Sequence, residues 1–179
     1  MKKFIIILLL AIPALEVAQN KTFHSFTVKD INGNDFNLSS LKGKKVLVVN
    51  VASKCGLTPQ YTDLQNLYKE YRDNNFTVIA FPANNFRSQE PGTNAEIQEF
   101  CTSEYGITFP LMEKISVKDD DIAPVYKWLT NKSENGKMDA EVQWNFQKFM
   151  IDESGNLVDM IAPKESPYSK KIIDWIKAN

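Results

Sequence analysis

The sequence predicts an α/β fold: one domain with a central mixed sheet and helices on both faces. A strand–helix–strand unit over residues 46–81 indicates two parallel strands joined by a helical crossover. Segments 142–151 and 157–161 are predicted as two further strands, joined by a hairpin loop at 152–155. An amino-terminal hairpin is predicted around the turn Asn32-Gly33. This order of elements is typical of a single layered domain.

The first half of the chain begins with the two hairpin strands, residues 26–31 and 35–38. A β-branched apolar run at 46–51 is typical of a buried strand. A helix is predicted from Pro59, because proline suits a first helical turn. Its apolar stripe comprises Tyr61, Leu64, Leu67, Tyr68 and Tyr71. The next strand is predicted at 76–81.

The second half opens with an irregular polar segment, residues 82–92. Thr93 and Glu96 have the spacing of a capping box and predict the start of a helix. That helix would carry four residues on one face: Ile97, Phe100, Cys101 and Tyr105. A short helix is predicted at 122–129. Ser166-Pro167 is expected to open a closing helix with the apolar stripe Tyr168, Ile172, Ile173 and Ile176.

Composition fits one globular domain with a hydrophobic core, since 43% of the 179 residues are hydrophobic. The 21 basic and 22 acidic residues nearly balance, and no basic stripe suggests a nucleic-acid partner. Residues 1–19 have a basic start and a short apolar stretch, which is typical of a secretory signal peptide. We therefore expect a mature domain over 20–179, exported to a periplasmic or extracellular location, without a stable membrane span. An uncleaved, membrane-tethering signal is the alternative.

Cys55 stands between the predicted strand at 46–51 and the helix predicted from Pro59. The positive end of a helix dipole and the neighbouring Lys54 both favour a thiolate there, which predicts a reactive cysteine. Small and polar neighbours argue against burial. The alternative is a buried structural thiol.

Several classes of cysteine chemistry lack the residues that they need. Thr58 occupies the position of the second cysteine in a Cys-x-x-Cys disulfide reductase. Cysteine hydrolases need an imidazole base, and the only histidine, His24, is interpreted as a surface or edge-strand residue. Two distant cysteines and one histidine match no metal-binding pattern, and a copper-handling protein would need Cys-x-x-x-Cys. Attack on peroxide oxygen needs no base and forms a sulfenic acid.

Three separated motifs carry a family resemblance. They are N-V-A-S-K-C-G-L-T at 50–58, F-P-A-N-N-F-R-S-Q-E-P-G at 81–92 and W-N-F-Q-K-F-M-I-D at 144–152. In this order, the chain closely resembles the glutathione peroxidase family from about Phe26 to its carboxyl end. The resemblance implies a thioredoxin-like fold with an amino-terminal hairpin.

The resemblance also implies a role for individual residues. Cys55 would be the peroxidatic residue, at the position where some relatives have selenocysteine, and no cofactor beyond an external thiol reductant is implied. Gln89, Trp144 and Asn145 would be the polar partners of its sulfur. Taken singly, Trp144 is interpreted as a core aromatic residue, Asn145 as a strand-end residue and Gln89 as a solvated loop residue.

Cys101, 46 residues after Cys55, matches the resolving cysteine of the family's thioredoxin-dependent members. The chain departs from many relatives at Ala83, where they have cysteine, and at Asn85, where glutamine is usual. Cys101 also shares an apolar helical face, so the alternative is a core cysteine. A disulfide requires Cα atoms within about 7 Å, which predicts that its helix unwinds on oxidation.

The resemblance implies a thiol peroxidase for hydrogen peroxide and organic or lipid hydroperoxides. Its donor would be a thioredoxin-like protein or glutathione, and the short segment before Trp144 implies a monomer. A redox relay that passes a disulfide to a partner protein would use the same residues. Lys148 is interpreted as a surface lysine, and Lys54 and Arg87 could steer an anionic reductant or lipid head group.

Overall fold

The central sheet has four strands in the order β4-β3-β5-β6 in the computed structural model, which describes residues 21–178. β3 (Lys45–Val51) pairs in parallel with β4 (Phe76–Pro82). On its other side β3 pairs antiparallel with β5 (Lys148–Ile151), which pairs antiparallel with β6 (Leu157–Ile161). The mixed sheet predicted from the sequence is confirmed.

A separate two-stranded hairpin, β1 (Thr27–Lys29) and β2 (Asp35–Asn37), lies near the amino-terminal end of the described chain. Its turn is fixed by the Asp30 carboxylate, which accepts backbone hydrogen bonds from Asn32 and Asn34 at 2.9 Å each. Gly33 has a φ of +83°, a conformation that glycine adopts readily. The predicted Asn-Gly hairpin is therefore confirmed.

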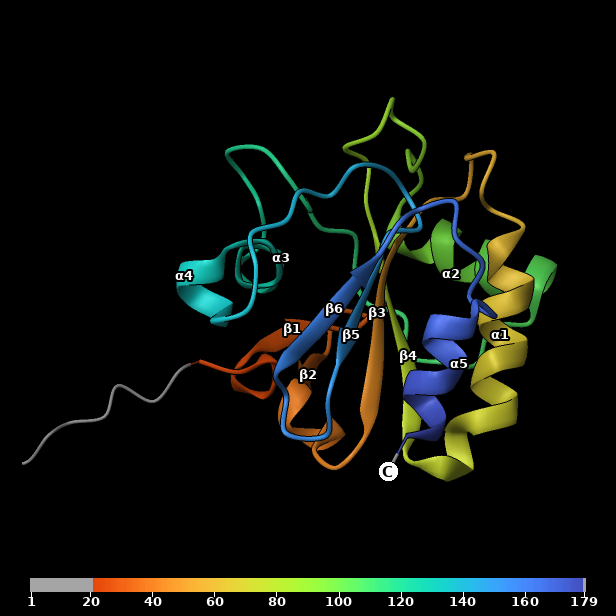
Figure 1. The fold of residues 1–179 in the computed structure, drawn as a ribbon. Helices are drawn as coiled ribbons and strands as arrows, with labels where there is room; N and C mark the ends of the chain where they lie inside the picture. The colour runs from red at the N-terminus through yellow and green to blue at the C-terminus, as the bar shows by residue number, and fades with distance from the viewer. Residues whose placement is uncertain (1–20, 179) are drawn as a thin grey trace, which may run out of the picture.

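Helices cover both faces of the central sheet (Figure 1). On one face lie α1 (Gln60–Tyr71) and α5 (Lys170–Lys177), and α2 (Asn94–Tyr105) lies beside α1. On the other face lie α3 (Pro124–Thr130) and α4 (Lys132–Asn135), together with the hairpin. Three short 3₁₀ turns complete the described elements: Phe23–Ser25, Leu38–Leu41 and Arg72–Asn74.

The alternation of side chains along β3 divides the core into two clusters. Leu47, Val49 and Val51 belong to a cluster with residues of α1, α2 and α5. Val46 and Val48 belong to a second cluster with residues of α3 and the amino-terminal segment. All five side chains are buried, so β3 is the strand around which both layers pack.

The predicted strand at 142–151 is wrong in its first six residues, because β5 begins only at Lys148. Phe146 has a φ of +67°, which interrupts an extended strand. The Gln147 side chain accepts a hydrogen bond from the Gln143 backbone N–H at 2.9 Å and closes a local loop. Trp144 and Asn145 therefore lie in a loop at the end of the sheet.

The closing helix also begins later than predicted. α5 starts at Lys170 rather than at Ser166-Pro167. Tyr168 precedes the helix and is 37% exposed, and its hydroxyl donates to Glu70 at 3.2 Å. The buried part of the stripe thus comprises Ile172 and Ile176.

The capping box of α2 is confirmed. The Thr93 hydroxyl accepts the Glu96 backbone N–H at 3.3 Å, and the Glu96 carboxylate accepts the Thr93 backbone N–H at 2.7 Å. At the other end, Gly106 terminates the helix in the left-handed conformation. Both ends of the helix that carries Cys101 are therefore well defined.

Lys148 is not the surface lysine expected from the sequence, because its side chain is fully buried. Its ammonium group donates to the Gln60 side-chain oxygen at 2.6 Å and to the carbonyls of Pro163 and Glu165 at 3.1 and 2.6 Å. Burial lowers the pKa of Lys148 to about 8, while Glu165 and Asp63 raise it. Lys148 thus joins β5, the start of α1 and the segment before α5.

The expected signal peptide at 1–19 and its boundary with the mature domain lie outside the described residues. Between residues 21 and 178, no helix is both long and apolar enough to span a membrane.

We predict that Lys148→Met lowers the free energy of unfolding by about 2 kcal/mol, because buried acceptors lose their donor. Urea denaturation measures the change, with the exposed Lys69→Met as control. Between pH 8 and 10.5 the unfolded lysine binds more protons than the folded one. Raising the pH through this window therefore stabilises the wild type relative to Lys148→Met. A destabilisation equal to that of Lys69→Met would contradict the account.

Candidate active site

Cys55 lies in the tight turn between β3 and α1, at the end of the sheet where β3 and β4 finish. Its sulfur accepts a hydrogen bond from the Leu57 backbone N–H at 3.4 Å. The side chain is 8% exposed, so the expectation that small and polar neighbours would keep it from burial is wrong. A backbone amide donates this hydrogen bond to the sulfur without itself titrating.

Thr58 holds this turn closed. Its hydroxyl donates to the Ala52 carbonyl at 2.9 Å and accepts the Cys55 backbone N–H at 3.0 Å. Its own backbone N–H donates to the Cys55 carbonyl at 3.0 Å. The residue that replaces a second cysteine therefore fixes the first one, a role that sequence reasoning missed.

Gln89 and Asn145 are brought together by the fold, although 56 residues separate them. The Asn145 side-chain amide donates to the Gln89 side-chain oxygen at 2.9 Å. Asn145 is fully buried, and its side-chain oxygen has no hydrogen-bond partner among the described residues. The Gln89 backbone carbonyl accepts a hydrogen bond from the backbone N–H of Lys54 at 3.0 Å. Because Lys54 directly precedes Cys55, this bond holds the Gln89–Asn145 pair beside the Cys55 turn.

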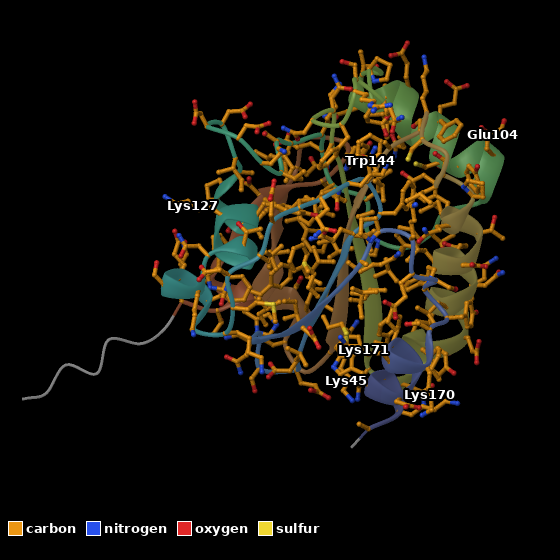
Figure 2. All side chains as sticks on the ribbon, turned by 45° about the horizontal axis from the view of Figure 1, so that its top comes forward. Lys45, Glu104, Lys127, Trp144, Lys170 and Lys171 are labelled. Atoms are coloured by element: carbon orange, nitrogen blue, oxygen red, sulfur yellow. The ribbon has the colours of Figure 1, made fainter. Side chains whose placement is uncertain are left out.

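Trp144 lies at the same end of the molecule as Asn145, the next residue in the chain. Figure 2 shows it far from Lys45, the first residue of β3. Its ring is half-buried and lies 5.3 Å from the Phe86 ring, and the Arg87 guanidinium is 5.6 Å from the ring centre. The Asn50 side chain donates to the Trp144 carbonyl at 3.1 Å. Trp144 thus contacts the segment that carries Gln89.

Three residues around the site have left-handed backbone conformations: Arg87 and Ser88 with φ of 53° and 51°, and Phe146 with 67°. Such angles are uncommon outside glycine and often occur at functional sites. They flank Gln89 on one segment and Asn145 on the other. The two loops therefore turn sharply where they meet.

Cys101 is fully buried on α2, and burial raises its pKa to about 11. The Tyr61 hydroxyl acts in the opposite direction, whereas the charge of Glu90 adds to the increase. Cys101 and Cys55 belong to the same apolar cluster, and neither forms a disulfide. Cys101 therefore lies among core residues, as its position on an apolar helical face indicates, and its resolving role stays a prediction.

His24 is buried and not at the surface as expected. It packs on Gly155 in the β5–β6 turn, where a Cβ atom would lie 2.7 Å from its ring. Burial lowers the pKa of His24. Because β5 runs antiparallel to β3, this turn lies at the opposite end of the sheet from Cys55. His24 is therefore not part of the Cys55 site.

Lys54 and Arg87 are both exposed, as a role in steering anions requires. Lys54 lines a pocket of about 410 Å³ between the Cys55 turn and α2. No cluster of three histidine, cysteine or carboxylate side chains suited to a metal ion occurs within residues 21–178.

Comparison with known proteins identifies close relatives. Residues 23–130 match the glutathione peroxidase family model. The chain is 46% identical over 150 residues to a glutathione peroxidase homologue, BsaA, of Halalkalibacterium halodurans, covering 84% of this chain and 95% of that protein. It is 47% identical over 153 residues to an Arabidopsis thaliana mitochondrial protein named probable phospholipid hydroperoxide glutathione peroxidase 6. That match covers 85% of this chain but 66% of the longer plant protein.

The chain also resembles solved structures of other proteins. The apo form of a protein named Trgpx superposes with a TM-score of 0.70 at 38% identity, covering 89% of this chain and 98% of that one. A thioredoxin-family thiol:disulfide interchange protein from Chlorobium tepidum superposes with a TM-score of 0.61 at 22% identity, covering 89% and 94%. The second match shows the fold alone and confirms that it is thioredoxin-like. The chain belongs to the glutathione peroxidase family, and it is a peroxidase, an oxidoreductase that uses peroxide as its acceptor.

Proposed function

We propose that the chain reduces hydrogen peroxide and organic or lipid hydroperoxides through Cys55. The observation that carries the proposal is the Gln89–Asn145 hydrogen bond, held beside the turn that presents Cys55. A relative is named for phospholipid hydroperoxide, which supports the lipid part of this substrate range. Gln89, Trp144 and Asn145 supply amide and indole groups that donate hydrogen bonds without titrating.

In the first step, the Cys55 thiolate attacks one peroxide oxygen. A sulfur–oxygen bond forms while the oxygen–oxygen bond breaks, and the leaving alkoxide or hydroxide takes up a proton. Cys55 becomes a sulfenic acid, and the peroxide becomes an alcohol or water. The polar groups around Cys55 stabilise the charge that moves from sulfur to the leaving oxygen.

In the second step, the Cys101 sulfur attacks the sulfur of sulfenic Cys55. The new disulfide replaces the sulfur–oxygen bond, and water leaves with the proton of Cys101. An external dithiol then reduces the disulfide. We propose a thioredoxin-like protein as the electron donor, because such a protein reduces a disulfide. If Cys101 were only a core residue and formed no disulfide with Cys55, glutathione would be the donor. We further propose a monomer that is exported through the signal at 1–19.

Cys55→Ser tests the assignment of the reacting residue. We expect the rate of peroxide reduction to fall by about 1000-fold or more, because serine is not ionised at neutral pH. The matched variant Cys101→Ser should still consume one equivalent of peroxide but lose turnover with thioredoxin. Unchanged turnover in Cys55→Ser would refute the mechanism. Stoichiometric oxidation of the wild type, with a trapped mixed disulfide, would instead indicate a redox relay.

Asn145→Ala tests the polar partners. The substitution leaves Gln89 without its buried donor, so we expect the rate of Cys55 oxidation by peroxide to fall by about 100-fold. Stopped-flow oxidation of the reduced chain measures this rate. Asn66→Ala, on the exposed face of α1, is the control and should react like the wild type. Equal rates in both variants would remove Asn145 from the site.

The burial of Cys101 predicts that α2 opens when the disulfide forms. Hydrogen exchange should therefore be faster in residues 94–105 of the oxidised chain than in the same residues of the reduced chain. The amides of α1 that follow Tyr61 in the sequence serve as the internal reference. Identical exchange of α2 in both redox states would show that Cys101 reaches Cys55 without unwinding its helix.

A further inference from the structure

A buried carboxylate joins the two loops that carry Cys55 and Gln89. Glu90 is 1% exposed and accepts two hydrogen bonds from Ser53, one from the backbone N–H at 2.8 Å and one from the hydroxyl at 3.1 Å. Ser53 lies two residues before Cys55, and Glu90 lies one residue after Gln89. A carboxylate is costly to bury unless it is well bonded, so this Ser53–Glu90 contact is a specific feature of the site.

The loop around Glu90 is fixed independently of Ser53. The Glu90 backbone N–H donates to the Asn84 side chain at 2.9 Å, and the Lys114 ammonium donates to the carbonyls of Glu90 and Gly92 at 3.3 and 2.6 Å. These bonds hold the backbone of Glu90 without the participation of Ser53. Its carboxylate therefore positions the Cys55 turn against a loop that is already anchored.

The same carboxylate acts on the segment that carries Cys101. Burial raises the pKa of Glu90, and its bonds with Ser53 and the charges of Lys114 and Lys54 lower it. The negative charge of Glu90 in turn contributes to the raised pKa values of Cys101 and Tyr61. Glu90 thus lies within electrostatic reach of both cysteine-bearing segments.

Space for movement exists beside the contact. The pocket of about 410 Å³ is bounded by Ser53, Lys54 and Glu90 on the loop side and by Ile97 and Phe100 of α2 on the other. The Cys55 turn and α2 are therefore not packed tightly along this boundary. A separation of Ser53 from Glu90 would open into this pocket.

We propose that Glu90 is a positioning residue that sets the balance between the two chemical steps of the peroxidase. While Ser53 is bonded to Glu90, Cys55 and Gln89 are held in the arrangement that reacts with peroxide. For Cys55 to join Cys101, the contact opens and the Cys55 turn moves toward α2. The inference rests on the function proposed above, including the resolving role of Cys101.

The two steps respond in opposite directions to the loss of this contact. Oxidation of Cys55 slows, since the turn is no longer held against Gln89. Disulfide formation accelerates, since the contact no longer has to break before sulfenic Cys55 meets Cys101. A substitution that disturbed only the reacting geometry of Cys55 would slow its oxidation without accelerating disulfide formation, which makes the opposite signs diagnostic.

The experiment uses the full mature chain, reduced and mixed rapidly with hydrogen peroxide. Acid quenching at successive times, followed by intact mass measurement, separates thiol, sulfenic and disulfide forms. Glu90→Gln keeps the size of the side chain but removes its charge. We expect Cys55 oxidation to slow about tenfold and disulfide formation to accelerate several-fold, as the loss of a charge-assisted hydrogen bond predicts.

Two further variants complete the test. Ser53→Ala removes only the hydroxyl bond, so both rates should shift in the same directions as in Glu90→Gln but by less; it also serves if Glu90→Gln does not fold. Glu99→Gln, an exposed glutamate of α2, makes the same change of charge and should react like the wild type.

Rates that fall together in Glu90→Gln and Ser53→Ala, or that do not change, would overturn the inference. A wild type that oxidises at Cys55 but forms no disulfide would overturn it as well. Failure of the proposed function is visible separately, because Cys55 of the wild type would then stay unmodified by peroxide.

Discussion

The hydrogen bonds between residues 53–54 and 89–90 are the constraint on which the site depends. The proposed reacting thiol and its proposed polar partners come from three segments, and each follows or precedes a different strand of the sheet. The Lys54–Gln89 backbone bond and the Ser53–Glu90 bonds join the first two segments, and the Gln89–Asn145 bond joins the third. Without these bonds, three loops at one end of a sheet would have no fixed arrangement.

The sheet places these loops but does not orient them. Because β3 and β4 are parallel, the chain leaves both at the same end, and the antiparallel β5 begins there (Figure 1). Orientation comes from short-range devices: the Thr58 hydroxyl in the Cys55 turn, and the left-handed conformation of Phe146 before β5. Lys148, the first residue of β5, also links this end of the sheet to the start of α1, because its ammonium group donates to the Gln60 side chain. The site is thus built on rigid elements and finished by turns.

Much of this could be predicted from the sequence, because local pattern determines it. The apolar run of β3, the Asn-Gly hairpin and the Thr93–Glu96 capping box each carry their signal within a few residues. Long-range pairing of polar groups has no such signal. Nothing near Glu90 in the sequence indicates its burial, and Lys148 is predicted at the surface, since a charged residue is rarely buried and its partners lie far away in sequence. Likewise, the chain before β5 is irregular because Phe146 has a left-handed backbone conformation. That conformation is not predictable from the sequence, since aromatic residues rarely adopt it.

The central claim is that Cys55 reacts with peroxide and that Cys101 completes the cycle. The most direct test treats the reduced chain with one equivalent of hydrogen peroxide and maps its peptides by mass under non-reducing conditions. The account predicts a linked pair of peptides that contain Cys55 and Cys101. Unmodified Cys55 after complete consumption of the peroxide by other residues would contradict it.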